Sequence, residues 1–112
     1  MILPKAQIQS TLAALGYTTK QSSQDSVTEA PAITFRIDDN APEYDLDNKI
    51  TAQSIVATVD IWADNSVMAS TILTEVEGAM RGINYQLTYS ADIPRPTGAL
   101  FHIQCRFEAL AV

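Results

Sequence analysis

Apolar and polar residues alternate along several segments of this chain, the pattern typical of strands that bury one face. The alternation is clearest at residues 101–109, where odd positions are apolar or small and even positions are mostly polar or charged. Residues 33–38 and 54–62 follow the same period, and 85–89 repeat it more briefly. Val, Ile and Thr, which favour strands, are frequent in the second of these segments. We therefore predict four strands, each with one buried and one presented face.

Two other segments place their apolar residues at helical spacing. Residues 4–15 have apolar side chains at i, i+4 and i+7 and begin with a proline, which suits a first helical turn. Between Asp64 and Gly82 an apolar residue recurs at every fourth position. We expect Asp64 to be the N-cap of this second helix, with Asn65 and Ser66 as competitors.

These elements predict an α+β fold, with a largely antiparallel sheet and two helices packed on one face. A chain of 112 residues has room for one hydrophobic core, so we expect a single domain over residues 1–112. Residues 17–31 and 38–49 show no period and are expected to be flexible loops, with a weak hairpin as the alternative for the first. The expected core comprises Val59, Ile61, Leu73, Val76, Phe101, Ile103, Cys105 and Phe107.

The net charge of −6 is concentrated in one part of the chain. It argues against binding to a nucleic-acid backbone, which requires Lys and Arg to displace counterions. An EF-hand pattern starting at Asp38 would need Gly and Glu where Glu43 and Lys49 stand, so we predict a solvated acidic segment without a specific cation. Its acidic residues are Asp38, Asp39, Glu43, Asp45 and Asp47.

Residues that could support catalysis are few and scattered. The single histidine, His102, and the single cysteine, Cys105, are three positions apart and point to opposite faces of a regular strand, which argues against a Cys–His pair. The sequence has no clustered glycines for a phosphate loop and no zinc pattern. We therefore expect no enzymatic activity, no cofactor and no metal.

Nothing in the sequence suggests a membrane protein. No apolar run approaches the roughly 20 residues needed to cross a bilayer. The first residues lack the basic-then-apolar order of a signal peptide, so we expect a cytoplasmic origin.

The presented positions of the last predicted strand form a polar row of mixed charge, which suits a contact between subunits. Trp62, at the end of an earlier strand, is an aromatic candidate for the same contact. The expected assembly interface is Trp62, His102, Gln104, Arg106 and Glu108.

Three short motifs occur in a recognisable order. Residues 58–62 form a strand that ends in Asp-Ile-Trp, and a helix follows that ends in Glu-Gly-Ala-Met-Arg at residues 77–81. The last strand carries a His-x-x-x-Arg-Phe motif at residues 102–107. In these features the chain resembles phage tail-completion proteins, the tail-terminator or head-to-tail joining subunits of long-tailed phages. The resemblance covers about residues 33–109 and departs from the family at 38–49, which is longer and more charged.

The resemblance implies a homohexameric ring at the head-proximal end of the tail tube. Such a ring ends tube polymerisation and joins the tail to the head, contacting the major tail tube protein and a head-side connector or stopper. DNA passes through without specific binding, and an acidic segment at residues 38–49 would suit the lumen or rim. The protein would belong to the virion neck, after assembly in the bacterial cytoplasm. The family supplies no catalytic residues.

Other readings of the sequence remain open. The closest is another neck component, such as a head–tail stopper or adaptor. A different class is a small module whose presented sheet face captures a peptide or a ligand. An enzyme subunit with a site shared across chains is the third.

Overall fold

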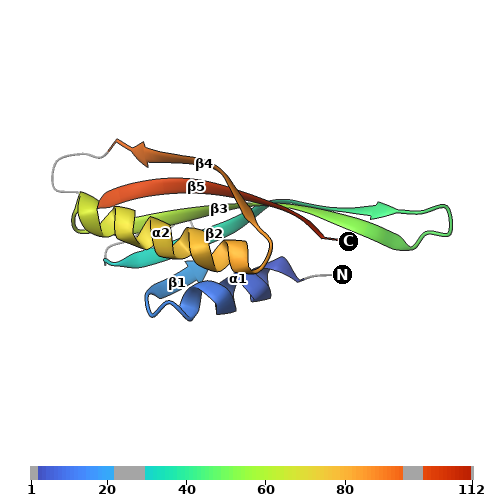
Figure 1. The fold of residues 1–112 in the computed structure, drawn as a ribbon, viewed down its shortest axis with the longest axis horizontal. Helices are drawn as coiled ribbons and strands as arrows, with labels where there is room; N and C mark the ends of the chain where they lie inside the picture. Colours follow the sequence, from blue (N-terminus) through green and yellow to red (C-terminus); the bar gives the residue numbers. More distant parts are fainter. Residues whose placement is uncertain (1–2, 22–29, 95–99, 112) are drawn as a thin grey trace.

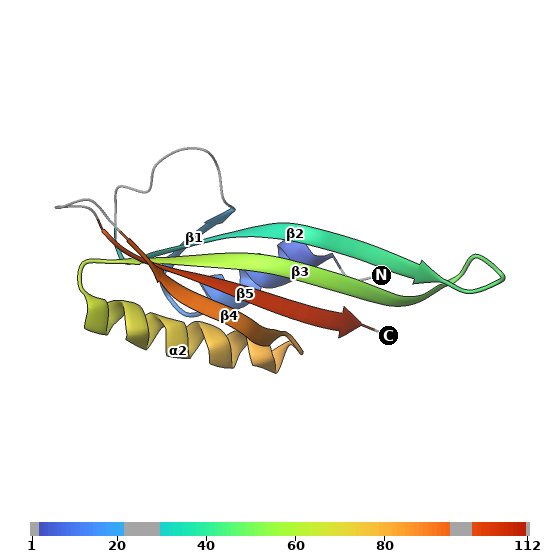
Figure 2. The same ribbon diagram turned by 90° about the horizontal axis from the view of Figure 1, so that it is seen from above.

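The computed structural model describes residues 3–21, 30–94 and 100–111. Its elements are α1 (Pro4–Ala13), β1 (Thr18–Gln21), β2 (Ala32–Tyr44), β3 (Ile50–Ala63), α2 (Ser66–Gly82), β4 (Gln86–Ile93) and β5 (Phe101–Ala111). The strands form one sheet in the order β1-β2-β3-β5-β4. β1 runs parallel to β2, and the other neighbouring strands are antiparallel. Both helices lie on the same side of the sheet (Figures 1 and 2), which confirms the predicted α+β fold.

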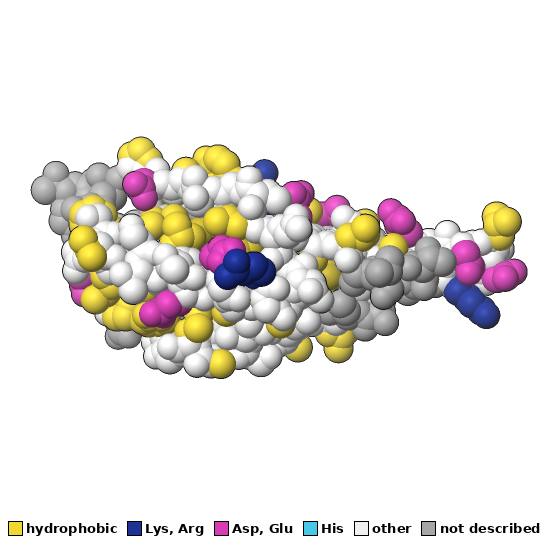
Figure 3. Space-filling view, viewed as in Figure 1, with side chains coloured by type: hydrophobic (Ala, Val, Ile, Leu, Met, Phe, Trp, Pro, Cys, Tyr) yellow, Lys and Arg dark blue, Asp and Glu magenta, His cyan; other side chains and the backbone are white. Residues whose placement is uncertain are grey.

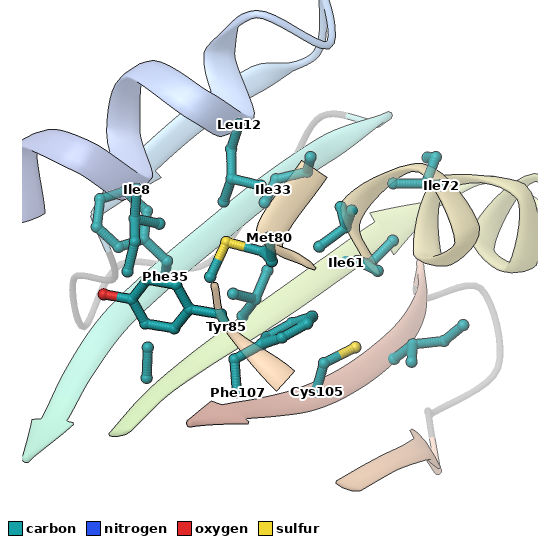
Figure 4. Close-up of a cluster of buried hydrophobic side chains, with 14 of the residues drawn as sticks. Ile8, Leu12, Ile33, Phe35, Ile61, Ile72, Met80, Tyr85, Cys105 and Phe107 are labelled. Atoms are coloured by element: carbon teal, nitrogen blue, oxygen red, sulfur yellow. The ribbon is translucent and has the colours of Figure 1, made fainter. Parts of the chain in front are cut away.

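The hydrophobic core lies between the two helices and the sheet (Figure 4). α1 contributes Ile8 and Leu12, which are completely buried. Of the eight expected core residues, Leu73 and Phe101 are only partly buried and pack against the edge of the core. Leu73 flanks the inward stripe of α2, and Phe101 is the first residue of β5. The other six are buried as predicted.

The start of α2 differs by one residue from the expected N-cap. The Oδ1 atom of Asn65 accepts a hydrogen bond from the backbone N–H of Met68 at 2.8 Å, so Asn65 and not Asp64 caps the helix. β3 extends to Ala63, and Asp64 lies in the bend between the strand and the helix. The cap therefore falls on the second of the three candidate residues.

The expected loop at residues 17–31 is wrong in its first part, because β1 occupies Thr18–Gln21. Residues 22–29 lie outside the described part of the chain. β1 pairs with residues Ala32–Phe35 of β2 at one edge of the sheet. Its side chains are exposed or half-buried on both faces, so no alternation of apolar and polar residues marks it in the sequence.

The expected loop at residues 38–49 is also wrong in part, because β2 continues to Tyr44 and pairs with β3. A register shift between Ile37 and Asp39 leaves Asp38 as a bulge, which interrupts the alternation along β2. Residues 38–52 form a hairpin that we call the arm, and it projects from one end of the molecule (Figures 1 and 2).

The arm gives the molecule an elongated shape. The principal extents are 55 × 26 × 21 Å and the radius of gyration is 15.1 Å. A compact domain of this length would have a radius of gyration of about 13 Å.

Candidate functional site

The sheet face opposite the helices, which we call the open face, is formed by even-numbered residues of β3 and β5. No described helix covers it (Figures 1 and 2). The strand register places Trp62 opposite His102, and Thr58 opposite Arg106. All five predicted interface residues therefore lie together on this face: Trp62, His102, Gln104, Arg106 and Glu108.

An aromatic pair is held in place at one end of the open face. The rings of Trp62 and His102 stack with their centroids 3.9 Å apart and an interplanar angle of 13°. Nε2 of His102 lies 2.7 Å from Oδ1 of Asp60. Nε1 of Trp62 donates a hydrogen bond to Oγ1 of Thr34 at 3.2 Å. Because each ring has a polar partner as well as the other ring, both are fixed in one orientation.

A second polar cluster joins the open face to the base of the arm. The carboxylate of Asp38 accepts hydrogen bonds from the hydroxyl of Thr58 and from Nε of Arg36, the latter at 2.9 Å. Burial alone would raise the pKa of Asp38, but these hydrogen bonds and the positive charges of Arg36 and Arg106 together outweigh it and hold the pKa below its ordinary value of 3.8. Asp38 is therefore a structural anion that links β2 to β3.

Asp60 and Thr58 belong to this site, although neither was among the site residues predicted from the sequence. We expected both side chains on the presented face, where the structure places them, but they are buried, with 5% and 2% of their surface exposed. The signal was available, because an aspartate in the middle of a strand rich in apolar residues requires a partner. The identity of that partner, His102, depends on the register between two strands distant in sequence.

Cys105 and His102 do not form a pair. Cys105 lies on the opposite face in the core, as its spacing from His102 predicted. Burial, with a smaller contribution from the charge of Asp60, raises the pKa of the Cys105 thiol to about 12. The thiol is therefore protonated at neutral pH.

No group of three or more His, Cys, Asp or Glu side chains in 3–21, 30–94 and 100–111 is arranged to hold a metal ion. In the same part of the chain, no helix has the length and apolar character needed to span a membrane.

The predicted acidic segment forms the arm, and its carboxylates have different roles. Asp38 is bound at the base, as described above. Oδ1 of Asp45 accepts hydrogen bonds from the backbone N–H groups of Asp47 at 2.8 Å and Lys49 at 2.9 Å, so this side chain shapes the turn. Asp39, Glu43 and Asp47 are exposed.

A small α+β domain with a pre-ordered polar face and a projecting arm has the construction of an assembly subunit. Comparison with known protein families matches residues 2–111 to the family described as "Tail completion protein gp17". The chain belongs to this phage tail-completion family, whose members are structural proteins of the phage tail. A comparison with curated proteins gave no match.

Family membership confirms the resemblance seen in residues 33–109 and extends it over nearly the whole chain. It supports a place in the virion and contacts with other proteins of the tail or neck.

Proposed function

We propose that this protein forms a ring at the head-proximal end of the tail tube, where it ends tube polymerisation and joins the tail to the head. The observation that carries the proposal is the open face, where two neighbouring strands present ordered polar and aromatic side chains that no described helix covers. A surface already fixed by its own hydrogen bonds loses little side-chain entropy when a partner binds.

A ring with two unlike sides explains how a tube can be ended. A tube elongates because each added layer recreates the surface to which the next layer binds. A terminator must match that surface on one side and differ from it on the other. The helices cover one face of this sheet and leave the other open, so the subunit supplies two dissimilar faces.

The partners in this proposal are the major tail tube protein on one side and a head-side connector or stopper on the other. The symmetry of the ring must equal that of the tube, and the family resemblance implies six subunits. The net charge of −6 is compatible with DNA passing through the ring without being retained.

Electron microscopy of a lysate from a phage that lacks this gene tests the proposal. We expect overlong tails without heads, beside heads filled normally with DNA. Tails of normal length that are joined to nothing would identify a connector and contradict termination. Heads that leak DNA before any tail attaches would identify a stopper instead.

A further inference from the structure

None of residues 38–49, the part of the arm whose side chains the structure describes without a gap, is buried, so this part shows no hydrophobic core. Within the described residues, β5 pairs with β3 as far as Gln53 and Ala111, and beyond this pair the hairpin has two strands. A two-stranded hairpin without further packing is marginally stable in water. Among the described side chains of the arm, Tyr44 and Leu46 near the tip are large, apolar and exposed, at 59% and 104%.

The turn at the tip of the arm is fixed by its own hydrogen bonds. The backbone N–H of Asp45 donates to the carbonyl of Lys49 at 2.9 Å, in addition to the two hydrogen bonds that the Asp45 side chain accepts. Asn48 has a φ of 60°, a value that Asn adopts more readily than most residues. The turn therefore presents Leu46 in a preformed conformation, and a preformed group loses less entropy when it binds a partner.

The charge of the arm is complemented elsewhere in the same sequence. Residues 38–52 hold five acidic residues and one basic residue, a net charge of −4. Residues 3–21, which we call the α1–β1 unit, hold Lys5 and Lys20 and no acidic residue. Both lysines are exposed. The unit also exposes an apolar side chain, Leu3, to 72%.

The arm of one molecule cannot use its own α1–β1 unit. Figures 1 and 2 both place the tip beyond the helices along the long axis of the molecule. Figure 3 shows acidic side chains at this end, together with basic and hydrophobic ones. A complementary contact therefore requires a second molecule.

We infer that the arm of each copy docks on the α1–β1 unit of the neighbouring copy. The acidic side chains of the arm face Lys5 and Lys20 of the neighbouring copy, and the apolar tip of the arm covers Leu3 of that copy. Because the two surfaces differ, the contact is head-to-tail, and such contacts close into a ring when the rotation between copies permits it. The inference rests on the proposed ring and identifies how its subunits are held.

The charge of the arm favours a copy of this chain over DNA as the occupant. A segment with a net charge of −4 is repelled by the phosphate backbone. An exposed contact between opposite charges is weakened by salt, so the docking should weaken as ionic strength rises.

Reversal and exchange of the charges tests the contact. One variant is D39K/D47K in the arm, a second is K5E/K20E in the α1–β1 unit, and a third combines all four substitutions. All four positions are exposed, so folding should be retained, and circular dichroism checks this. Each variant is supplied to a phage that lacks the gene, and copies of the protein per purified tail are counted.

We expect each double variant to lower the number of bound copies about tenfold and the combined variant to restore it to within about threefold of the wild type. The matched control is D64K/D92K, which makes the same charge change at exposed positions outside the arm and should leave the number unchanged. Normal incorporation of D39K/D47K, or no recovery in the combined variant, would overturn the docking.

The outcomes separate the docking from the proposed function. If the gene deletion gives overlong tails but the combined variant does not recover, the docking is rejected and the proposed function stands. Recovery by charge exchange with tails of normal length in the deletion would support the docking and reject tube termination.

Discussion

Asp60 and Thr58 are polar side chains buried on a sheet face that the helices leave open. Each has a partner, His102 for Asp60 and Asp38 for Thr58. A buried polar group that loses its partner costs about 1–3 kcal/mol. These side chains therefore hold the open face in one arrangement, and changes at their partners should have larger effects than their position near the surface suggests.

Replacing Asp38 with Asn tests this at a titratable position. The folded pKa of Asp38 lies below its ordinary value of 3.8, so the carboxylate contributes stability above that pH and loses the contribution as pH falls through the folded pKa. We expect Asp38→Asn to lower the free energy of unfolding at neutral pH, and the difference from the wild type to shrink in acid. Urea unfolding at several pH values measures both effects.

The control for Asp38 is its exposed neighbour, Asp39. Asp39→Asn should change the free energy of unfolding by less than about 0.5 kcal/mol at any of these pH values. A stability loss in Asp38→Asn that is the same in acid and at neutral pH would show that the charge of Asp38 is not involved.

The sequence predicted which face of the sheet a side chain occupies, but not its hydrogen-bond partner. The period of two along a strand placed His102 and Cys105 on opposite faces, and the structure agrees. The pairing of His102 with Asp60 depends on how β3 and β5 align, and no local pattern specifies that alignment.

Among the elements, burial decides which ones the sequence reveals. The strands at residues 54–62 and 101–109 and both helices bury one face, so their periodicity identified them. β1 and the outer half of β2 are exposed on both faces, and a strand of this kind leaves no alternating pattern. The arm was missed for this reason, together with the bulge at Asp38.

The N-cap of α2 should contribute measurably to stability. Asn65→Ala removes the hydrogen bond to the N–H of Met68 and should lower the free energy of unfolding by about 1 kcal/mol. Asp64→Ala, one residue earlier and exposed, should have little effect. Chemical denaturation of both variants measures the difference. A larger loss in Asp64→Ala would place the cap where the sequence first suggested it.

For the whole molecule, the family was recognisable from sequence, whereas the shape was not. The order of a strand, a helix and a final strand carried the resemblance to tail-completion proteins, and the family match confirms it. The length of 55 Å arises because β2 and β3 extend beyond the other strands of the sheet. How far they extend depends on pairing between distant segments of the chain. Contacts between subunits are still harder to predict from the sequence, because they depend on surfaces that a single chain leaves exposed.

We expect the open face to act as an assembly surface. Arg106 is exposed there, opposite Thr58, and arginine is frequent among residues that dominate the energy of interfaces. Arg106→Ala should leave the melting temperature close to that of the wild type, because the side chain is exposed. It should nevertheless lower the yield of infectious particles about tenfold when the variant replaces the wild type, since a planar, charged contact is lost.

Arg81→Ala is the matched control for Arg106→Ala. Arg81 lies on α2, on the helix-covered side of the sheet, and contacts Glu77 at 3.5 Å in an exposed ion pair that contributes little to stability. We expect this variant to give a normal yield of particles, measured in the same complementation assay. Equal yields from the two variants would mean that the open face is not an assembly surface, whereas a loss confined to Arg106→Ala would assign that role to the side of the sheet that the helices leave uncovered.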